Sequence, residues 1–325
     1  MHRRYVAAPH RRLLENNNML RTAPMPGIGQ HGAVAAPTEI VIGIATIGRP
    51  AFLRETLGRI AVQTMRPSRV LVCYTAPEDI AGLDSHDTDF IMSPPGLPAQ
   101  RNLILDKLGA SSAILFVDDD FLMAPRYVEA TLQAMQSDPG IVVTTGDLIA
   151  DGSKGPGLSF AEAQAMMDAD GRMPLRHGVM PAPHGYGCNM AIRHDVAQAH
   201  GIRFDERLPL YAWSEDMDFT HRLGRHGRMV KLRGARGVHL GVKQGRTSGR
   251  RLGYSQVANP IYLFQKGSYT LGRAVRSIGR NVVANLVHSI RPEPWIDRHG
   301  RLLGNARAVA DIARGRLRPE RILEF

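Results

Sequence analysis

Alternating apolar and polar segments predict a series of strands and helices. Residues 40–45 form a short apolar run that ends in a polar loop, which is typical of a buried parallel strand. Apolar residues at helical spacing predict a helix over 52–63, and a second β-rich run covers 69–74. Strand, helix and strand joined by short connections indicate a βαβ unit, and therefore an α/β fold with a parallel sheet.

The alternation continues beyond this unit. Further helices are expected over 99–108, 126–136 and 214–225, and further strands over 113–117, 141–145, 186–192 and 229–232. Residues 151–183, rich in Gly, Met and Pro, are expected to form an irregular insertion, and the Gly/Arg/Ser stretch 245–251 a mobile loop.

A long helix with two distinct faces is predicted near the end of the chain. Its apolar stripe consists of Leu271, Val275, Ile278, Val282 and Leu286, and its opposite face carries Arg273, Arg276 and Arg280. Two interpretations are open: the helix packs on the core with a solvated arginine face, or it docks on an anionic membrane without crossing it.

The charge of the chain is unevenly distributed. The 325 residues carry a net charge of +11, which divides into +4 for residues 1–37, −4 for 38–240 and +11 for 241–325. A uniformly basic nucleic-acid-binding protein would not show an acidic middle, so the pattern favours a globular core with an end that meets an anionic surface. We expect 1–37 to be a disordered basic tail, with Met25 as an alternative start.

Several classes of protein are excluded. The two cysteines, Cys73 and Cys188, cannot form a disulfide scaffold or a four-cysteine zinc site. No apolar run approaches the roughly 20 residues of a membrane-spanning helix. Residues 1–37 lack the apolar centre of a signal peptide, so the expected location is cytoplasmic.

Three consecutive aspartates follow an apolar strand. Asp118, Asp119 and Asp120 come after 113–117, and the carboxyl end of a parallel strand is where ligands bind. A divalent cation would relieve the repulsion among these carboxylates, and hard oxygen ligands favour Mn²⁺ or Mg²⁺. In the structural alternative, one aspartate caps the next helix and the others are solvated.

A second acidic cluster opens the helix expected over 214–225. Glu215 and Asp216 lie in its first turn, where the helix dipole favours carboxylates, or one of them is a general base at the mouth of the site. Asp218 and Arg222, four residues apart, are expected to form a structural ion pair.

Three further residues are candidates on chemical grounds. His239 is a structural residue or the nitrogen ligand of a manganese site that includes Asp120. Arg101 is suited to pairing with a diphosphate, although a solvated position explains it equally well. Asn189 follows two glycines and offers both a donor and an acceptor to a substrate hydroxyl.

Taken in order, these segments resemble the family 2 glycosyltransferases of the GT-A fold. The matching segments are an opening strand with Thr46 and Arg49, Gln100 to Asn102, Phe116 to Asp120, Gly187 to Ala191, Glu215 to Asp218 with Arg222 and Gly227, and Val238-His239. The resemblance covers about residues 39–240. It implies an α/β GT-A catalytic domain over 38–240, with a mostly parallel central sheet flanked by helices, and a C-terminal helical extension within the basic segment 241–325.

The resemblance also implies roles for individual residues. Asp118 is similar to the residue that meets the nucleotide ribose, and Thr46 and Arg49 to parts of the nucleotide pocket. Asp119 and Arg101 are expected on the same donor side. The family's acidic turn after the second strand is altered, because its usual aspartate is absent or displaced to Asp79, so the donor base is not implied.

Catalysis and metal binding are assigned in the same way. Asp120 is similar to the metal ligand of the DxD motif, and His239 to a further metal ligand of many members. Asp216 is similar to the catalytic base. Acceptor contacts are expected from Asn189, Trp213 and Glu215.

We therefore expect a metal-dependent inverting glycosyltransferase that uses a nucleotide-diphosphate sugar. The expected acceptor is a glycan or a lipid-linked molecule in polysaccharide, glycolipid or cell-envelope synthesis, and the expected location is cytoplasmic or peripheral on the inner face of the membrane.

Two other functions are weighed against this one. A sugar-phosphate nucleotidyltransferase would need a Gly-rich basic loop after the first strand, where residues 46–50 offer only Arg49. A basic nucleic-acid-binding protein would leave the aspartates unexplained, and the basic end of the chain lacks interleaved aromatic residues, so we expect no nucleic-acid partner.

Overall fold

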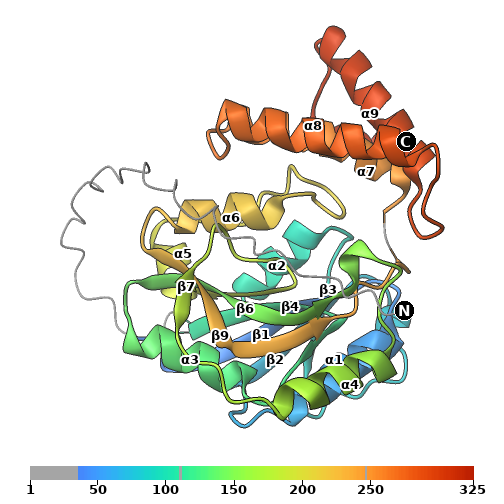
Figure 1. Cartoon of the computed structure of the whole chain (residues 1–325). Helices are drawn as coiled ribbons and strands as arrows, with labels where there is room; N and C mark the ends of the chain where they lie inside the picture. Colours follow the sequence, from blue (N-terminus) through green and yellow to red (C-terminus); the bar gives the residue numbers. More distant parts are fainter. Residues whose placement is uncertain (1–35, 110–111, 246) are drawn as a thin grey trace, which may run out of the picture. The chain divides into compact units, whose positions relative to one another are not determined.

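A mixed β-sheet forms the centre of the computed structural model, which describes residues 36–109, 112–245 and 247–325 (Figure 1). The described strands are β1 (Glu39–Ala45), β2 (Arg69–Tyr74), β3 (Asp89–Met92), β4 (Ser112–Asp118), β5 (Phe121–Met123), β6 (Ile141–Asp151), β7 (Val179–Pro181), β8 (Asn189–Arg193) and β9 (Arg228–His239). They follow the order β3-β2-β1-β4-β8-β6-β9-β5, and β7 pairs with β9.

Helices surround this sheet and continue beyond it. They are α1 (Pro50–Ala61), α2 (Leu97–Leu105), α3 (Tyr127–Ser137), α4 (Phe160–Gly171), α5 (His194–Ala199), α6 (Glu215–Leu223), α7 (Gly249–Gln265), α8 (Leu271–His288) and α9 (Arg298–Ala313). Three short 3₁₀ helices are η1 (Pro77–Ile80), η2 (Gly152–Lys154) and η3 (Pro319–Glu324). The predicted α/β architecture of a central sheet flanked by helices is confirmed.

The sheet has a parallel part and an antiparallel part. Strands β3, β2, β1 and β4 run parallel, as the βαβ pattern predicted. Strand β8 enters between β4 and β6 and is antiparallel to both, while β6 and β9 are again parallel to each other. The sheet is therefore mixed, with a larger antiparallel share than the sequence pattern indicated.

Side chains that alternate along β1 enter two different hydrophobic cores. Ile40 and Ile44 face the core that α1 and α3 complete, and Val41 faces the core that α2, α5 and α6 complete. Figure 1 shows α1 and α3 on one side of the sheet and α2 and α6 on the other. A strand buried on both faces has no polar position, which explains why the apolar run 40–45 identified it correctly.

Two predicted irregular segments contain regular structure. The expected insertion 151–183 holds η2, α4 and β7, and α4 begins with a capping box in which Ser159 and Glu162 bond each other's backbone N–H groups. Gly249 to Arg251, predicted as part of a mobile loop, form the first turn of α7, whose N-cap is Ser248. Of that predicted loop, Arg246 lies outside the described residues.

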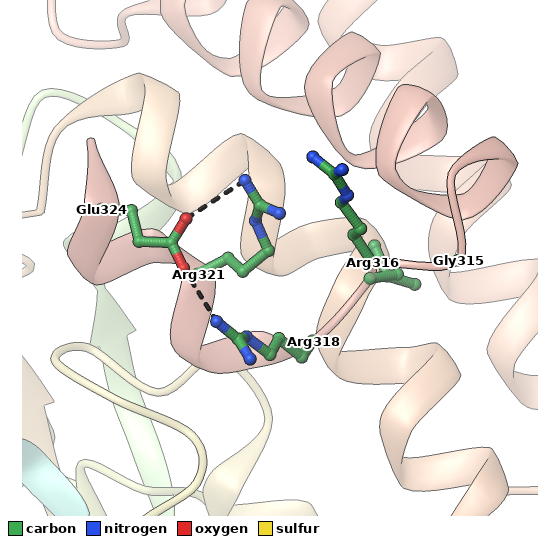
Figure 2. Close-up of a pocket in the computed structure, with 6 residues that line it drawn as sticks. Gly315, Arg316, Arg318, Arg321 and Glu324 are labelled. Carbon is green, nitrogen blue, oxygen red and sulfur yellow. Dashed lines mark hydrogen bonds and ion pairs between the residues drawn. The ribbon is translucent and has the colours of Figure 1, made fainter.

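Glycines allow α7 and α9 to pack closely in the helical extension. A Cβ on Gly253 would lie 2.0 Å from the carbonyl oxygen of Arg301, and one on Gly304 would lie 2.1 Å from that of Arg250. After α9 the chain returns along η3, where Glu324 forms ion pairs with Arg318 and Arg321 (Figure 2). The described residues from 36 onward belong to one compact unit.

The long helix predicted near the end of the chain is α8, but its apolar stripe is divided between two environments. Ile278 and Val282 pack against the core of the extension. Leu271, Val275 and Leu286 are 59%, 61% and 56% exposed. The stripe therefore does not pack on the core as a whole.

The predicted basic tail lies, up to residue 35, outside the described part of the chain, as does Met25. Among the described helices, none combines the length and the apolar character that crossing a membrane requires.

We predict that Gly253→Ala lowers the free energy of unfolding by about 1–3 kcal/mol, because the added methyl group collides with backbone of α9. Gly279→Ala in α8 is the control: a Cβ there meets nothing within 4 Å, and alanine raises helix stability by about 0.5–1 kcal/mol. Denaturant unfolding of both variants measures the difference. An equal effect of the two substitutions would contradict close α7–α9 packing.

Candidate functional site

Four strands end at the same edge of the sheet and bring the acidic residues together. Asp118 ends β4 and lies opposite Ala45 of β1 in the register of the sheet. Asp151 ends β6 and lies opposite His239, the last residue of β9. Residues that are more than 100 positions apart in the sequence therefore meet because these strands end together.

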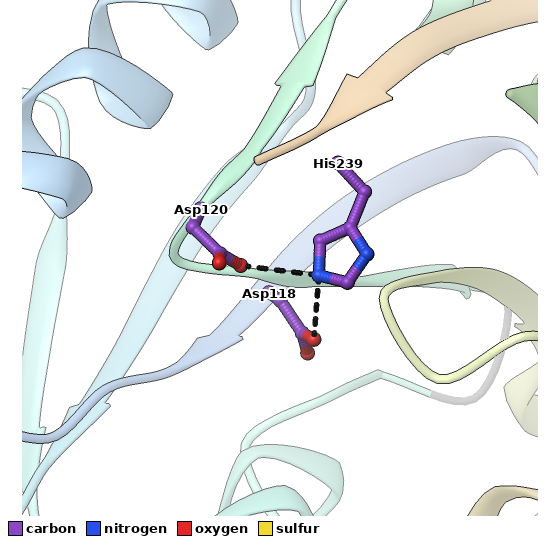
Figure 3. A group of neighbouring side chains, drawn as sticks. All are labelled: Asp118, Asp120 and His239. Atoms are coloured by element: carbon purple, nitrogen blue, oxygen red, sulfur yellow. Dashed lines mark ion pairs between the residues drawn. The ribbon is translucent and has the colours of Figure 1, made fainter. Parts of the chain in front are cut away.

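Asp118, Asp120 and His239 form the cluster drawn in Figure 3. The Nε2 atom of His239 lies 3.5 Å from Oδ1 of Asp120 and 3.9 Å from Oδ2 of Asp118. One ligand atom from each residue lies within 4.8 Å of the others, so the group could hold a metal ion. The side chain of Asp118 is 33% exposed and those of Asp120 and His239 are 3% and 9% exposed, so the cluster opens to solvent on the Asp118 side.

Asp151 holds the imidazole ring of His239 in place and was missed by the sequence analysis. Its Oδ1 atom lies 2.9 Å from Nδ1 of His239 and accepts the backbone N–H of Ser153, and its Oδ2 atom accepts the hydroxyl of Tyr186. With Nδ1 directed at this carboxylate, Nε2 faces Asp118 and Asp120. A carboxylate behind a histidine is the usual partner of a metal-binding imidazole.

Burial and opposite charges act against each other on the pKa values of this cluster. Burial opposes ionisation of Asp120, but His239 and Arg49 lower the pKa of its carboxyl to about 2. Burial likewise favours neutral His239, yet Asp120 and Asp151 raise the pKa of its imidazole well above the usual value. A cation bound by the same atoms would compete with protonation of His239.

Asp119 stands between Asp118 and Asp120 in the sequence, but its side chain lies inside the protein. It is 0% exposed, its Oδ2 accepts the hydroxyl of Thr46 at 2.7 Å, and its Oδ1 lies 2.7 Å from Arg49 Nη2. Burial raises the pKa of Asp119 to about 7, against the opposing charge of Arg49. Asp119 therefore fixes Thr46 and Arg49 at the site, and direct contact of these residues with a donor stays a prediction.

Arg101 and Glu215 form a buried ion pair. Nη1 of Arg101 lies 2.7 Å from Oε1 of Glu215, and Nη2 donates to the carbonyl oxygen of Gly187 and lies 3.4 Å from Asp118 Oδ1. Burial raises the pKa of Glu215 to about 8 despite the charge of Arg101. Arg101 was expected to contact the donor and Glu215 the acceptor, but in the structure they contact each other. Their contacts with substrates stay predictions.

Asp216, the second residue of α6, follows Glu215 of this ion pair. Its Oδ2 atom accepts the backbone N–H of Gly187 at 3.0 Å, and the side chain is partly exposed. The predicted Asp218–Arg222 pair is confirmed at 2.9 Å, and Lys266 also binds Asp218 at 2.8 Å. Asp216 is thus the carboxylate of this turn that solvent reaches.

The loop before α6 has an unusual backbone. Leu210, Ala212 and Ser214 have φ angles of +58°, +52° and +73°, a region that non-glycine residues seldom adopt. The amide of Asn259 in α7 donates to the carbonyl oxygen of Trp213 at 2.9 Å and helps to hold the loop. Such strain is typical of positions that the surrounding structure fixes for a purpose.

Two other residues named from the sequence have structural partners. Asn189 is 0% exposed, and its amide oxygen accepts the hydroxyl of Thr145 at 2.7 Å, so acceptor binding by Asn189 stays a prediction. Asp79 accepts N–H groups of Gly48, Thr75 and Ala76. These bonds use both oxygens of Asp79 to join two loops, which explains its position without a donor base.

The fold is similar to known glycosyltransferase structures. GalNAc-T7 with UDP, GalNAc and Mn²⁺ is 14% identical, with a TM-score of 0.51 over 86% of this chain and 59% of that chain. TarS 1–349 from S. aureus is 14% identical (TM-score 0.48, 85% and 92% covered). Mannosyltransferase PcManGT from Pyrobaculum calidifontis with GDP-Man and Mn²⁺ is 12% identical (TM-score 0.49, 90% and 88% covered).

No protein-family model and no curated protein matches the sequence. The similarity to GalNAc-T7 shows that the chain has the GT-A fold, so the predicted fold is confirmed.

We predict that Arg101→Met lowers the free energy of unfolding by about 1–3 kcal/mol, because buried acceptors on Glu215 and Gly187 lose their donor. The double variant Arg101→Met/Glu215→Gln should recover part of this loss. Equal losses in single and double variants would instead assign the role of Arg101 to its packing on Phe116 and Phe204. Denaturant unfolding at constant pH provides the measurement.

Proposed function

We propose that the protein is a metal-dependent inverting glycosyltransferase, related to family 2, that uses a nucleotide-diphosphate sugar. The observation that carries the proposal is the Asp118–Asp120–His239 cluster at the carboxyl edge of a GT-A sheet. The partly exposed Asp216 is linked to Asp118 of this cluster through Gly187 and Arg101. The similar structure of GalNAc-T7 contains UDP, GalNAc and Mn²⁺, which include a nucleoside diphosphate and a divalent cation of the kind that this proposal requires.

The donor set of the cluster fits Mn²⁺ or Mg²⁺. It combines two hard carboxylates with one imidazole, which suits Mn²⁺ especially, and Asp151 orients the imidazole from behind. Asp118, Asp120 and His239 would hold the ion. A divalent ion bound there supplies positive charge that stabilises a diphosphate leaving group.

Asp216 is the proposed general base. Its carboxylate would take the proton of the acceptor hydroxyl as that oxygen bonds to the anomeric carbon, and the bond from this carbon to the diphosphate would break with its electron pair on the departing oxygen. Attack from the face opposite the leaving group inverts the anomeric centre. The N–H of Gly187 holds the carboxylate at 3.0 Å and fixes its direction.

Binding of nucleoside diphosphates tests this function. Each of UDP, GDP, ADP and CDP is added to the full chain with and without Mn²⁺, and thermal unfolding is recorded. A ligand at about 100 times its dissociation constant adds about 2.7 kcal/mol of stability. We expect one of them to stabilise the protein only with Mn²⁺, and Asp120→Ala to abolish that effect. No stabilisation by any of the four would contradict the proposal.

Replacing the base should separate chemistry from binding. We predict that Asp216→Asn lowers kcat by about 10²–10⁴, because the amide cannot accept the proton, while donor affinity stays within about twofold. Transfer kinetics and donor titration are measured on the same preparation. A parallel loss of donor affinity would assign Asp216 to donor binding.

Asp151 should control metal affinity without touching substrate. We predict that Asp151→Asn weakens Mn²⁺ binding by about 10–100-fold, because His239 loses the carboxylate that orients its ring. Asp147→Asn on the same strand is the control, since Asp147 pairs with Arg236 and Lys231 instead. Free Mn²⁺ is measured by electron paramagnetic resonance, and equal affinities of the two variants would exclude the positioning role.

A further inference from the structure

Helix α8 exposes apolar side chains along one face. Five of them lie within an arc of about 160° at 100° per residue, and a sixth follows the helix end: Leu271, Val275, Val283, Leu286, Val287 and Ile290. Their exposed fractions range from 56% for Leu286 to 82% for Ile290. We call these six residues the α8 apolar face.

The side of α8 that faces the protein includes a buried polar group beside the packed Ile278 and Val282. Asn285, 1% exposed, donates to the side chains of Gln256 in α7 and Asn305 in α9, both at 2.9 Å. Arg298 in turn donates to Asn285. The helix therefore directs Ile278, Val282 and the amide of Asn285 at the protein and leaves a second set of aliphatic groups at the solvent. A contiguous exposed apolar surface of this kind marks an interaction site.

Positive charge borders the α8 apolar face. Residues 267–292 contain four arginines and no aspartate or glutamate. At 100° per residue Arg276 lies between Val283 and Val287 near one edge of the face, and Arg280 lies just beyond that edge. Both are exposed, and neither forms an ion pair within the described part of the chain. Long arginine side chains beside an apolar face can reach lipid headgroups while the apolar groups enter the acyl boundary.

We propose that α8 docks the protein on an anionic lipid surface, with the α8 apolar face inserted and Arg276 and Arg280 at the headgroups. The helix lies flat on this surface, since its 18 residues are not apolar enough to span a bilayer. A two-fold contact with a second copy fits less well. It would bring arginines of both helices to one seam, and neither helix carries a carboxylate to pair with them.

The docking surface is joined to the turn that begins α6. Arg273 of α8 contacts His221 of α6 at 3.0 Å, and both Arg273 and Tyr269 contact the sulfur of Met217, which follows Asp216 in sequence. Membrane contact at α8 would thus act on the helix that carries Asp216. If the proposed function holds, this arrangement suits an acceptor that is itself held in the membrane.

Co-sedimentation of the full chain with vesicles tests the docking without any donor or acceptor. Vesicles of phosphatidylcholine alone are compared with vesicles containing 30% phosphatidylglycerol, at low and high salt. We expect binding only to the anionic vesicles, weakened by salt. Arg276→Gln/Arg280→Gln should lower the partition coefficient about 30-fold, taking about 1 kcal/mol for each arginine.

A second pair of variants tests the apolar contribution. Val283→Glu/Leu286→Glu should reduce binding at least tenfold, whereas Val62→Glu, at an equally exposed apolar position after α1, should not. Unchanged thermal unfolding verifies that these surface variants fold. The proposal is overturned by absence of vesicle binding, by binding that ignores lipid charge, or by a dimer in sedimentation velocity that Val283→Glu/Leu286→Glu dissociates. Because the assay measures lipid binding directly, a negative result would contradict membrane docking alone. The proposed transferase function would still be tested separately by nucleotide binding.

Discussion

Burial of one carboxylate, that of Asp119, sets the geometry on which the site depends. Thr46 and Arg49 after β1 both bind it, and the hydroxyl of Thr56 in α1 donates to the backbone oxygen of Asp119 at 2.8 Å. With the middle aspartate turned inward, Asp118 and Asp120 are left to face His239. The cost of enclosing this carboxylate is offset by a cation and a hydroxyl group. The burial of Asp119 therefore also determines how Asp118 and Asp120 are placed to bind a metal ion.

The extension stabilises the same site from the other side of α6. Lys266 and Ser268 bind the buried Asp218, and Asn259 binds the carbonyl oxygen of Trp213 in the loop before α6. Helix α6 is therefore held at its base by residues beyond position 241. The change in composition at position 241 separates an acidic segment from a basic one. Side chains of both segments nevertheless hold the helix that carries Asp216.

The sequence predicted those strands and helices whose formation depends on residues close together in the chain. Strand β2 has the bounds read from its apolar run, because a strand buried on both faces has no alternative. Helix α4 was missed although Ser159 and Glu162 form a capping box, because its apolar residues do not gather on one face of the helix. Asp151 could not be assigned, because its role depends on the pairing of β6 with β9. The orientation of α8 depends on amides of two other helices, which periodicity within α8 cannot reveal.

The three left-handed residues before α6 have a consequence for how the protein can be changed. Glycine would relieve the strain at Leu210, Ala212 or Ser214, since it adopts a positive φ without steric conflict. Selection for thermal stability alone would therefore accept glycine at these positions. The same change would make the backbone before α6 more flexible. Thermal stability would then rise while the position of the Asp216 carboxylate became less well defined. In this segment, substitutions that stabilise the protein would lower its activity.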